Sequence, residues 1–346
     1  MRRTNWVLCM GLVAMALSPG CKKGVESAAG PIKEQAEEHY TKARRLFLAC
    51  DPDNYGQSIK EYQLALNLWD EYPEALAGLA EAISMWRGFM ISEQEFGDAY
   101  QYAQRALRLN PELPAGYRAM ADLSRHRKDY ERSLRQVEMA IRIEPESAEN
   151  LYVKGSALLE SDPQKAYEVL FKAKKLNPEL AKTYFNLASA CQKLGRLQEA
   201  IGYLEKYRQM VPSDISGLCA MGMNKLGMVG LEKSEPRDRQ LQDEAASSFK
   251  LAIAKGDPTA KPWQAPWLLI SYKALARMDF EAKNYKDALE KLNKAMDIFA
   301  DDPELQYLLA MCYKELGDRK SARARLQRAL EIVPDNEDLK KELKKL

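Results

Sequence analysis

Side chains that could do chemistry are few and scattered in this sequence. The histidines are His39 and His126, which lie far apart in the chain. A zinc site or a histidine-based proton relay needs several such groups close together. The sequence contains no glycine-rich phosphate loop, no Gly-x-Ser-x-Gly turn and no His-Glu-x-x-His helix. We therefore predict no catalytic residue, no metal and no cofactor, and a protein that is not an enzyme.

The cysteines beyond the N-terminal region are Cys50, Cys191, Cys219 and Cys312. An exported protein can oxidise them, and Cys191 with Cys219 is then the pair that neighbouring repeats favour most. Cys191 and Cys312, however, fall at apolar positions of helical segments, where cysteine acts as a small buried hydrophobe. Free thiols are the favoured interpretation, with a disulfide as the alternative.

The N-terminus has the composition of an export signal. Arg2 and Arg3 precede the apolar run 6–17, which is too short for a membrane span of about 20 residues. We predict a signal peptide over 1–20; the alternative is a buried N-terminal helix.

The residues around Cys21 resemble the lipobox of bacterial lipoproteins, with Gly20 before the cysteine and Ser18 where leucine is usual. The resemblance implies that Cys21 carries lipid, that residues 21–30 form a flexible tether, and that the protein sits in the bacterial cell envelope, on the periplasmic side of the outer membrane. The alternative is cleavage after Ala16 and a soluble periplasmic or secreted protein.

Overall charge excludes one class of partner. The chain has 52 basic and 50 acidic residues, so no concentrated basic face points to nucleic acid. Richness in Ala, Leu, Glu, Lys and Arg favours helix.

A short sequence motif that ends in proline is repeated along the chain. Pro111, Pro145, Pro178 and Pro212 are separated by 34, 33 and 34 residues. Before Pro145 and Pro178, small residues seven apart flank a larger apolar one, as in Ala166, Leu170 and Ala173, which lets two helices approach closely. Glycines such as Gly195 and Gly317 are placed to end the preceding helix.

This pattern resembles the tetratricopeptide repeat. The resemblance implies an all-α fold in which tandem helix–turn–helix repeats form a right-handed α-solenoid superhelix. We expect about eight hairpins, followed by a capping helix over 335–346 whose polar back closes the array. The hairpins are expected at 31–72, 73–113, 114–147, 148–180, 181–214, 215–258, 269–302 and 303–334.

In such repeats the first helices line a concave groove that binds a protein or peptide. The resemblance places groove contacts at positions that mix aromatic, methionine and basic side chains. These positions are Arg118, Asp122, Arg125, Tyr152, Phe185, Asn186, Ser189, Gln192, Met223, Lys273, Arg277, Tyr307, Met311 and Lys314. Lys273 and Arg277 have the spacing of a carboxylate clamp, but its companion residues are replaced by Phe185 and Ser189, so solvated groove residues are the favoured interpretation.

The functional hypothesis is an exported, lipid-anchored scaffold for assembly of an envelope complex, such as a pilus or secretion machinery. Its membrane contact would be the lipid anchor alone. The alternative is a soluble periplasmic or secreted adaptor for peptidoglycan or polysaccharide enzymes.

Overall fold

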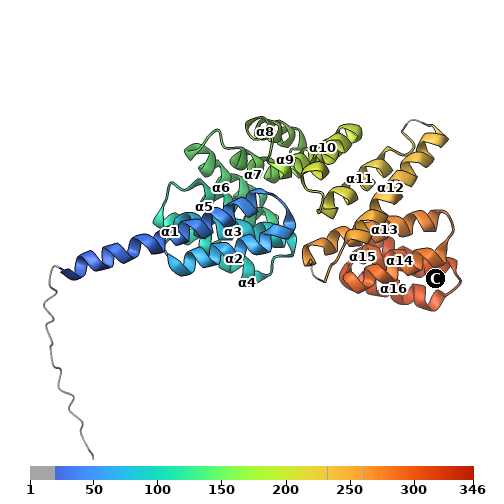
Figure 1. The fold of residues 1–346 in the computed structure, drawn as a ribbon. Coiled ribbons are helices and arrows are strands. Elements are labelled where there is room, and N and C mark those ends of the chain that lie inside the picture. The colour runs from blue at the N-terminus through green and yellow to red at the C-terminus, as the bar shows by residue number, and fades with distance from the viewer. Residues whose placement is uncertain (1–19, 232, 260) are drawn as a thin grey trace, which may run out of the picture.

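Helices in hairpins make up the fold (Figure 1). A computed structural model describes residues 20–231, 233–259 and 261–346, and these residues contain no strand. The hairpins, in chain order, are α1 (Gly20–Leu48) with α2 (Pro52–Leu68), α3 (Pro73–Arg87) with α4 (Glu93–Leu109), α5 (Pro114–His126) with α6 (Tyr130–Ile143), α7 (Ala148–Leu158) with α8 (Pro163–Leu176), α9 (Ala181–Lys193) with α10 (Leu197–Met210), α11 (Ile215–Met228) with α12 (Glu235–Lys255), α13 (Ala265–Glu281) with α14 (Tyr285–Ile298), and α15 (Pro303–Glu315) with α16 (Arg319–Ile332).

Three short elements complete the described chain: the 3-10 helices η1 (Gly88–Met90) and η2 (Pro262–Gln264), and the terminal helix α17 (Glu337–Lys344). Helix α17 lies against α16, and its Leu339 is 6% exposed. The prediction of an all-α array of helical hairpins is confirmed.

The structure differs from the sequence-based expectation at two helix starts. Helix α1 begins at Gly20 and not near Pro31, so residues 21–30, expected to be a flexible tether, are helical. Ala28, Ala29 and the lysines of this segment have good helix propensity, which its glycines concealed. Helix α13 begins at Ala265, before the expected start at 269. Residues 1–19 of the predicted signal lie outside the described residues.

The turns inside the hairpins share one geometry. Gly195 and Gly317 follow the first helices of their hairpins with φ of 74° and 84°. The amide of the residue after each, Arg196 or Asp318, donates back to a carbonyl five residues earlier, which ends the helix as a left-handed cap does. Lys128 and Lys283 stand at the same place in their hairpins with φ of 61° and 64°, a region that costs a side-chain-bearing residue about 1–2 kcal/mol.

Within a hairpin, a large apolar side chain of the second helix enters a gap left by small residues. Ala166, Leu170 and Ala173 on α8 are all fully buried, as their spacing predicts. A Cβ atom on Gly155 of α7 would lie 2.5 Å from Leu170 Cγ, so only glycine permits this approach. The repeated pattern therefore produces a continuous core.

The solenoid curves until its first hairpin meets its later ones. The α1–α2 loop lies beside the segment before α13, while the N-terminal part of α1 projects from the packed body (Figure 1). Ser213 Oγ donates to Asp51 Oδ1 at 2.8 Å, and Lys261 Nζ lies 2.6 Å from Asp53 Oδ2. We call this set of contacts the closure.

Among the described residues, no helix combines the length and apolar character needed to cross a bilayer.

Candidate functional site

The closure leaves a cavity of about 530 Å³ between the first hairpin and the concave face behind it. We call it the central cavity. One side is formed by Cys50, Pro52 and Tyr55 of the first hairpin and by Trp86 at the end of α3. Helices α5, α7 and α9 also contribute to the lining, as do Trp263 of η2 and Trp267 of α13. Its volume lies within the range of roughly 300–1,000 Å³ that is typical of small-ligand sites.

Aromatic rings dominate the lining. Phe185 of α9 is central to one side, with its ring 5.3 Å from that of Tyr207 and 5.8 Å from that of Trp267, both in edge-to-face contact. Such contacts hold rings in fixed orientations. The cavity therefore presents rigid flat apolar surfaces that suit a ligand with a planar apolar part.

Helix α9 contributes several further lining residues along a single face. Lys182, Phe185, Asn186 and Ser189 follow one another at helical spacing, and all line the cavity. Asn186 Nδ2 donates to Ser156 Oγ at 2.6 Å, which fixes the orientation of that amide.

Lys182 is the charged group of the lining that lacks an acidic partner among the described residues. Its Nζ lies 4.4 Å from the ring centre of Tyr152 and 5.0 Å from that of Phe47, while no carboxylate lies within 4.0 Å. Burial lowers the pKa of Lys182, but electrostatic attraction to neighbouring acidic groups, Tyr152 first, outweighs this and leaves the pKa above its ordinary value. The ammonium is thus charged at neutral pH.

The other ionic groups of the lining are paired. Arg87 binds Glu95 at 2.6 Å, and Lys193 binds Glu160 at 2.8 Å. Asp214 accepts a short hydrogen bond from Tyr207 and another from Ser216.

Ser84, Asp122 and His126 lie close together beside the cavity, near the C-terminal end of α5. Ser84 Oγ donates to Asp122 Oδ2 at 3.1 Å and lies 3.1 Å from His126 Nδ1. Because the one serine proton goes to Asp122, the His126 Nδ1–H must donate to Ser84, and its Nε2 accepts from Arg125 at 2.5 Å. Burial, followed by the Arg125 charge, lowers the pKa of His126 to about 3.

This cluster lacks the geometry of a nucleophilic triad. His126 donates to Ser84 and cannot accept its proton, and Ser84 is fully buried. Burial raises the pKa of Asp122, but the Arg125 guanidinium outweighs burial and holds that pKa below its ordinary value. The cluster joins α3 to α5 as a structural contact.

Six of the predicted groove residues come together at the central cavity: Arg125, Tyr152, Phe185, Asn186, Ser189 and Gln192. Asp122 lies beneath it, 4% exposed and bound to Arg125. The spacing thus located one side of the cavity.

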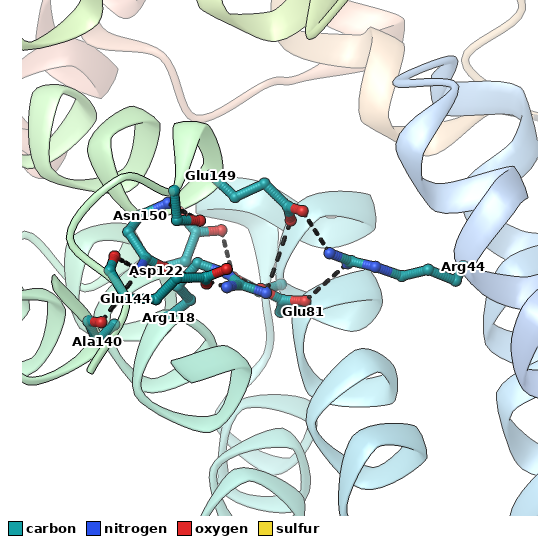
Figure 2. A network of polar contacts seen from close by, with 10 residues as sticks. Arg44, Glu81, Arg118, Asp122, Ala140, Glu144, Glu149 and Asn150 are labelled. Atoms are coloured by element: carbon teal, nitrogen blue, oxygen red, sulfur yellow. Dashed lines mark hydrogen bonds and ion pairs between the residues drawn. The ribbon is translucent and has the colours of Figure 1, made fainter. Parts of the chain in front are cut away.

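Arg118, expected in the groove, is instead a buried structural residue, 5% exposed (Figure 2). Its Nε donates to Glu81 at 2.8 Å and its Nη1 to Asn150 at 3.1 Å. Arg44 of α1 reaches the same Glu81 and also Glu149, at 3.2 and 2.5 Å. Because these groups come from α1, α3, α5 and α7, we call them the ionic spine; it joins the first four hairpins.

The predicted groove residues nearer the C-terminus lie outside the central cavity. Lys273 binds Asp302 and Glu304, and Arg277 also pairs with Glu304, so the spacing of a carboxylate clamp is satisfied inside the chain. Lys314 lies 3.3 Å from Glu342 of α17. Tyr307 and Met311 pack beside the capping helix, whereas Met223 is 41% exposed.

Sequence reasoning missed Lys182, Trp86 and the pair Trp263 and Trp267. The two tryptophans of the pair lie where the repeat is interrupted, so no period marks them. Lys182 occupies the second position of its helix, next to the positions that the repeat assigns to the groove. Only the closure, which joins residues far apart in sequence, gives these side chains a common site.

Cys50, Cys191, Cys219 and Cys312 are free and buried. Cys191 and Cys312 are at most 1% exposed, in agreement with their prediction as small buried hydrophobes. Burial raises the pKa of the Cys191 thiol to about 12. Within the described part of the chain, no group of three His, Cys, Asp or Glu side chains is arranged to hold a metal ion.

Two family models match separate parts of the chain. The model for the tetratricopeptide repeat matches residues 279–346, and that for the anaphase-promoting complex (cyclosome) subunit 3 matches 126–207. A BBSome complex member BBS4 homolog from Drosophila melanogaster is 24% identical over 164 residues, or 47% of this chain. The chain covers 32% of that relative's length.

Solved structures show the same fold at low identity. The Cut9-Hcn1 hetero-tetramer of the APC/C matches with a TM-score of 0.67 and 18% identity, over 88% of this chain and 54% of the matched chain. A monomeric mutant of IFIT1 with Gppp-AAAA matches with a TM-score of 0.59 and 15% identity, over 86% and 71% of the two chains. Together with the hairpin array, these matches show the tetratricopeptide-repeat fold, and the family model identifies the repeat itself over residues 279–346.

Proposed function

We propose that the chain is a scaffold that binds a partner protein through the first helices of its last three hairpins, α11, α13 and α15. These helices contact one another in series, and their row forms a continuous surface. Tetratricopeptide arrays commonly present such rows to a peptide or helix of another protein. We call this row the C-terminal groove.

Exposure at one repeat position carries the proposal. The ninth residue of the repeat is Asp122 in the third hairpin and Ser156 in the fourth, and each is 4% exposed. The same position holds Met223 and Arg277 in the sixth and seventh hairpins, where the side chains are 41% and 55% exposed. This position is thus buried in the third and fourth hairpins and exposed in the sixth and seventh, where it can contact a partner.

The chemistry of the C-terminal groove favours a partner segment with apolar side chains. Met223 is flexible and adaptable, a property that suits partner recognition. The cation Arg277 is already paired with Glu304, so the surface carries little net charge at that point.

Site-specific photo-crosslinking tests this surface. A photoreactive amino acid at position 223 should cross-link one defined partner in intact cells. The matched control is position 139 on the second helix α6, because Met139 is exposed to a similar degree, 38%. The same cross-links from both positions, or none from 223, would overturn the proposal. A Met223→Arg substitution should then abolish co-purification of the identified partner, and Met139→Arg should not.

We further propose that the protein is exported and lipid-anchored through Cys21, and that its partners belong to an envelope assembly such as a pilus or secretion machinery. The basic and apolar N-terminal residues and the lipobox-like segment support this proposal. Labelled fatty acid should be incorporated by the wild type and not by Cys21→Ala, with Cys50→Ala as the control. Equal labelling of wild type and Cys21→Ala would leave the soluble periplasmic or secreted adaptor as the better description.

A further inference from the structure

The central cavity is separate from the C-terminal groove and has a distinct chemistry. Its lining comes from segments far apart in the chain, with Tyr55 and Trp86 from the first two hairpins and Trp263 and Trp267 from η2 and α13. A solenoid needs no internal cavity for stability, since each hairpin already packs on its neighbours.

The charge of the lining defines what the cavity can hold. Lys182 has aromatic neighbours in place of an acidic partner, whereas Arg87 and Lys193 are each paired with a glutamate. A partly buried ammonium without a carboxylate in direct contact is costly, and an anion beside it offsets that cost. Since Lys182 offers one charge, a ligand with one negative charge is matched, and a dianion would leave one charge buried without a partner.

The geometry places the charge and the flat surfaces on one helix face. Phe185 and Asn186 follow Lys182 by three and four residues and therefore lie on its face of α9. A planar group against Phe185 and the nearby tryptophans would direct a carboxylate towards Lys182. Asn186, whose amide nitrogen is held by Ser156, leaves its carbonyl oxygen to accept a donor on the ligand.

We propose that the central cavity binds a small aromatic monocarboxylate, with its ring against Phe185, Trp263 and Trp267 and its carboxylate on the Lys182 ammonium. This site is independent of partner binding through the C-terminal groove. Occupancy would bridge the first and seventh hairpins, because both contribute to the walls.

Two probes of nearly equal shape test the proposal. Naphthalene-1-carboxylate and its neutral amide are titrated into the purified full-length protein at pH 7, by calorimetry and by tryptophan fluorescence. The carboxylate should bind about 10-fold or more tightly than the amide, because only the carboxylate can form an ion pair with the Lys182 ammonium. Equal affinity for the two probes, or no saturable binding of the carboxylate, would overturn the proposal.

Substitutions assign the site. Lys182→Met should remove the preference for the carboxylate, and Lys182→Arg should retain it. The matched control is Lys174→Met, because Lys174 also lies over aromatic rings, 4.2 Å from the centre of Phe171, but outside the cavity. Trp263→Ala should weaken the binding of both probes equally. A Lys182→Met protein that is folded by circular dichroism and keeps the full preference would disprove the role of Lys182.

Discussion

At the residue scale, buried polar groups in this protein serve the fold, and the ionic spine is the clearest case. Arg118 joins Glu81, Glu149 and Asn150 while only 5% exposed. We expect Arg118→Met to lower the free energy of unfolding by about 3–5 kcal/mol, because it leaves buried carboxylates without their cation. The exposed pair Arg328 and Asp301 is the control, and Arg328→Met should destabilise the protein far less, because solvent screens an exposed ion pair. Urea unfolding measures both; equal losses would contradict a structural role for the spine.

His126 makes stability depend on pH. Its pKa is lowered to about 3 in the folded protein, against an ordinary value of 6.5, because burial and Arg125 disfavour its charged form. The unfolded chain therefore binds a proton first as the pH falls, and stability should drop between pH 6.5 and 3, by at most about 1.4 kcal/mol per pH unit. Urea midpoints at pH 7 and 5 should differ less in His126→Gln than in the wild type. A full wild-type difference retained in His126→Gln would refute the assignment.

At the scale of elements, the turn inside several hairpins contains a position with positive φ that is glycine in some hairpins and lysine in others. Gly195 and Gly317 occupy it without strain, while Lys128 and Lys283 adopt the same positive φ. We expect Lys128→Gly to stabilise the protein by roughly 0.5–1 kcal/mol, and Gly195→Ala to destabilise it by about 1 kcal/mol. Thermal unfolding should show opposite signs for the two substitutions. A destabilising Lys128→Gly would mean that the lysine side chain contributes more than its backbone strain costs.

The elements that could be predicted from the sequence are those determined by residues close together in the chain. The repeated motif that ends in proline and the spacing of Ala166, Leu170 and Ala173 each lie within one hairpin. The helices and their pairing were therefore predictable. Arg118 was wrongly expected in the groove because its position in the repeat does not reveal that Glu81, one hairpin away, binds it. The start of α1 was missed because the glycines of the 21–30 segment suggested a coil.

At the scale of the whole molecule, the central cavity was not predictable because it depends on curvature summed over several hairpins. Residues of α5, α7 and α9 that were predicted to share one face do line the cavity together, since neighbouring repeats determine their positions. That they contact a partner stays a prediction. Tyr55 and Trp263 come from segments that meet only after the solenoid has turned back on itself. No sequence period connects two such segments, so this half of the site required the structure.

The contact between Lys261 and Asp53 in the closure can be tested by reversing its charges. Lys261 and Asp53 are each about one-third exposed, so their ion pair alone is worth little, but a like charge at this contact opposes the approach of the two ends. Lys261→Glu should open the cavity, and acrylamide should then quench the fluorescence of Trp263 and Trp267 more strongly than in the wild type. Adding Asp53→Lys reverses the pair and should restore the wild-type quenching. Lys294→Glu, which breaks a pair within α14, controls for the change in net charge and should leave quenching unaltered. If Lys261→Glu leaves quenching unchanged, or Asp53→Lys fails to reverse its effect, the two ends are not held together through this contact.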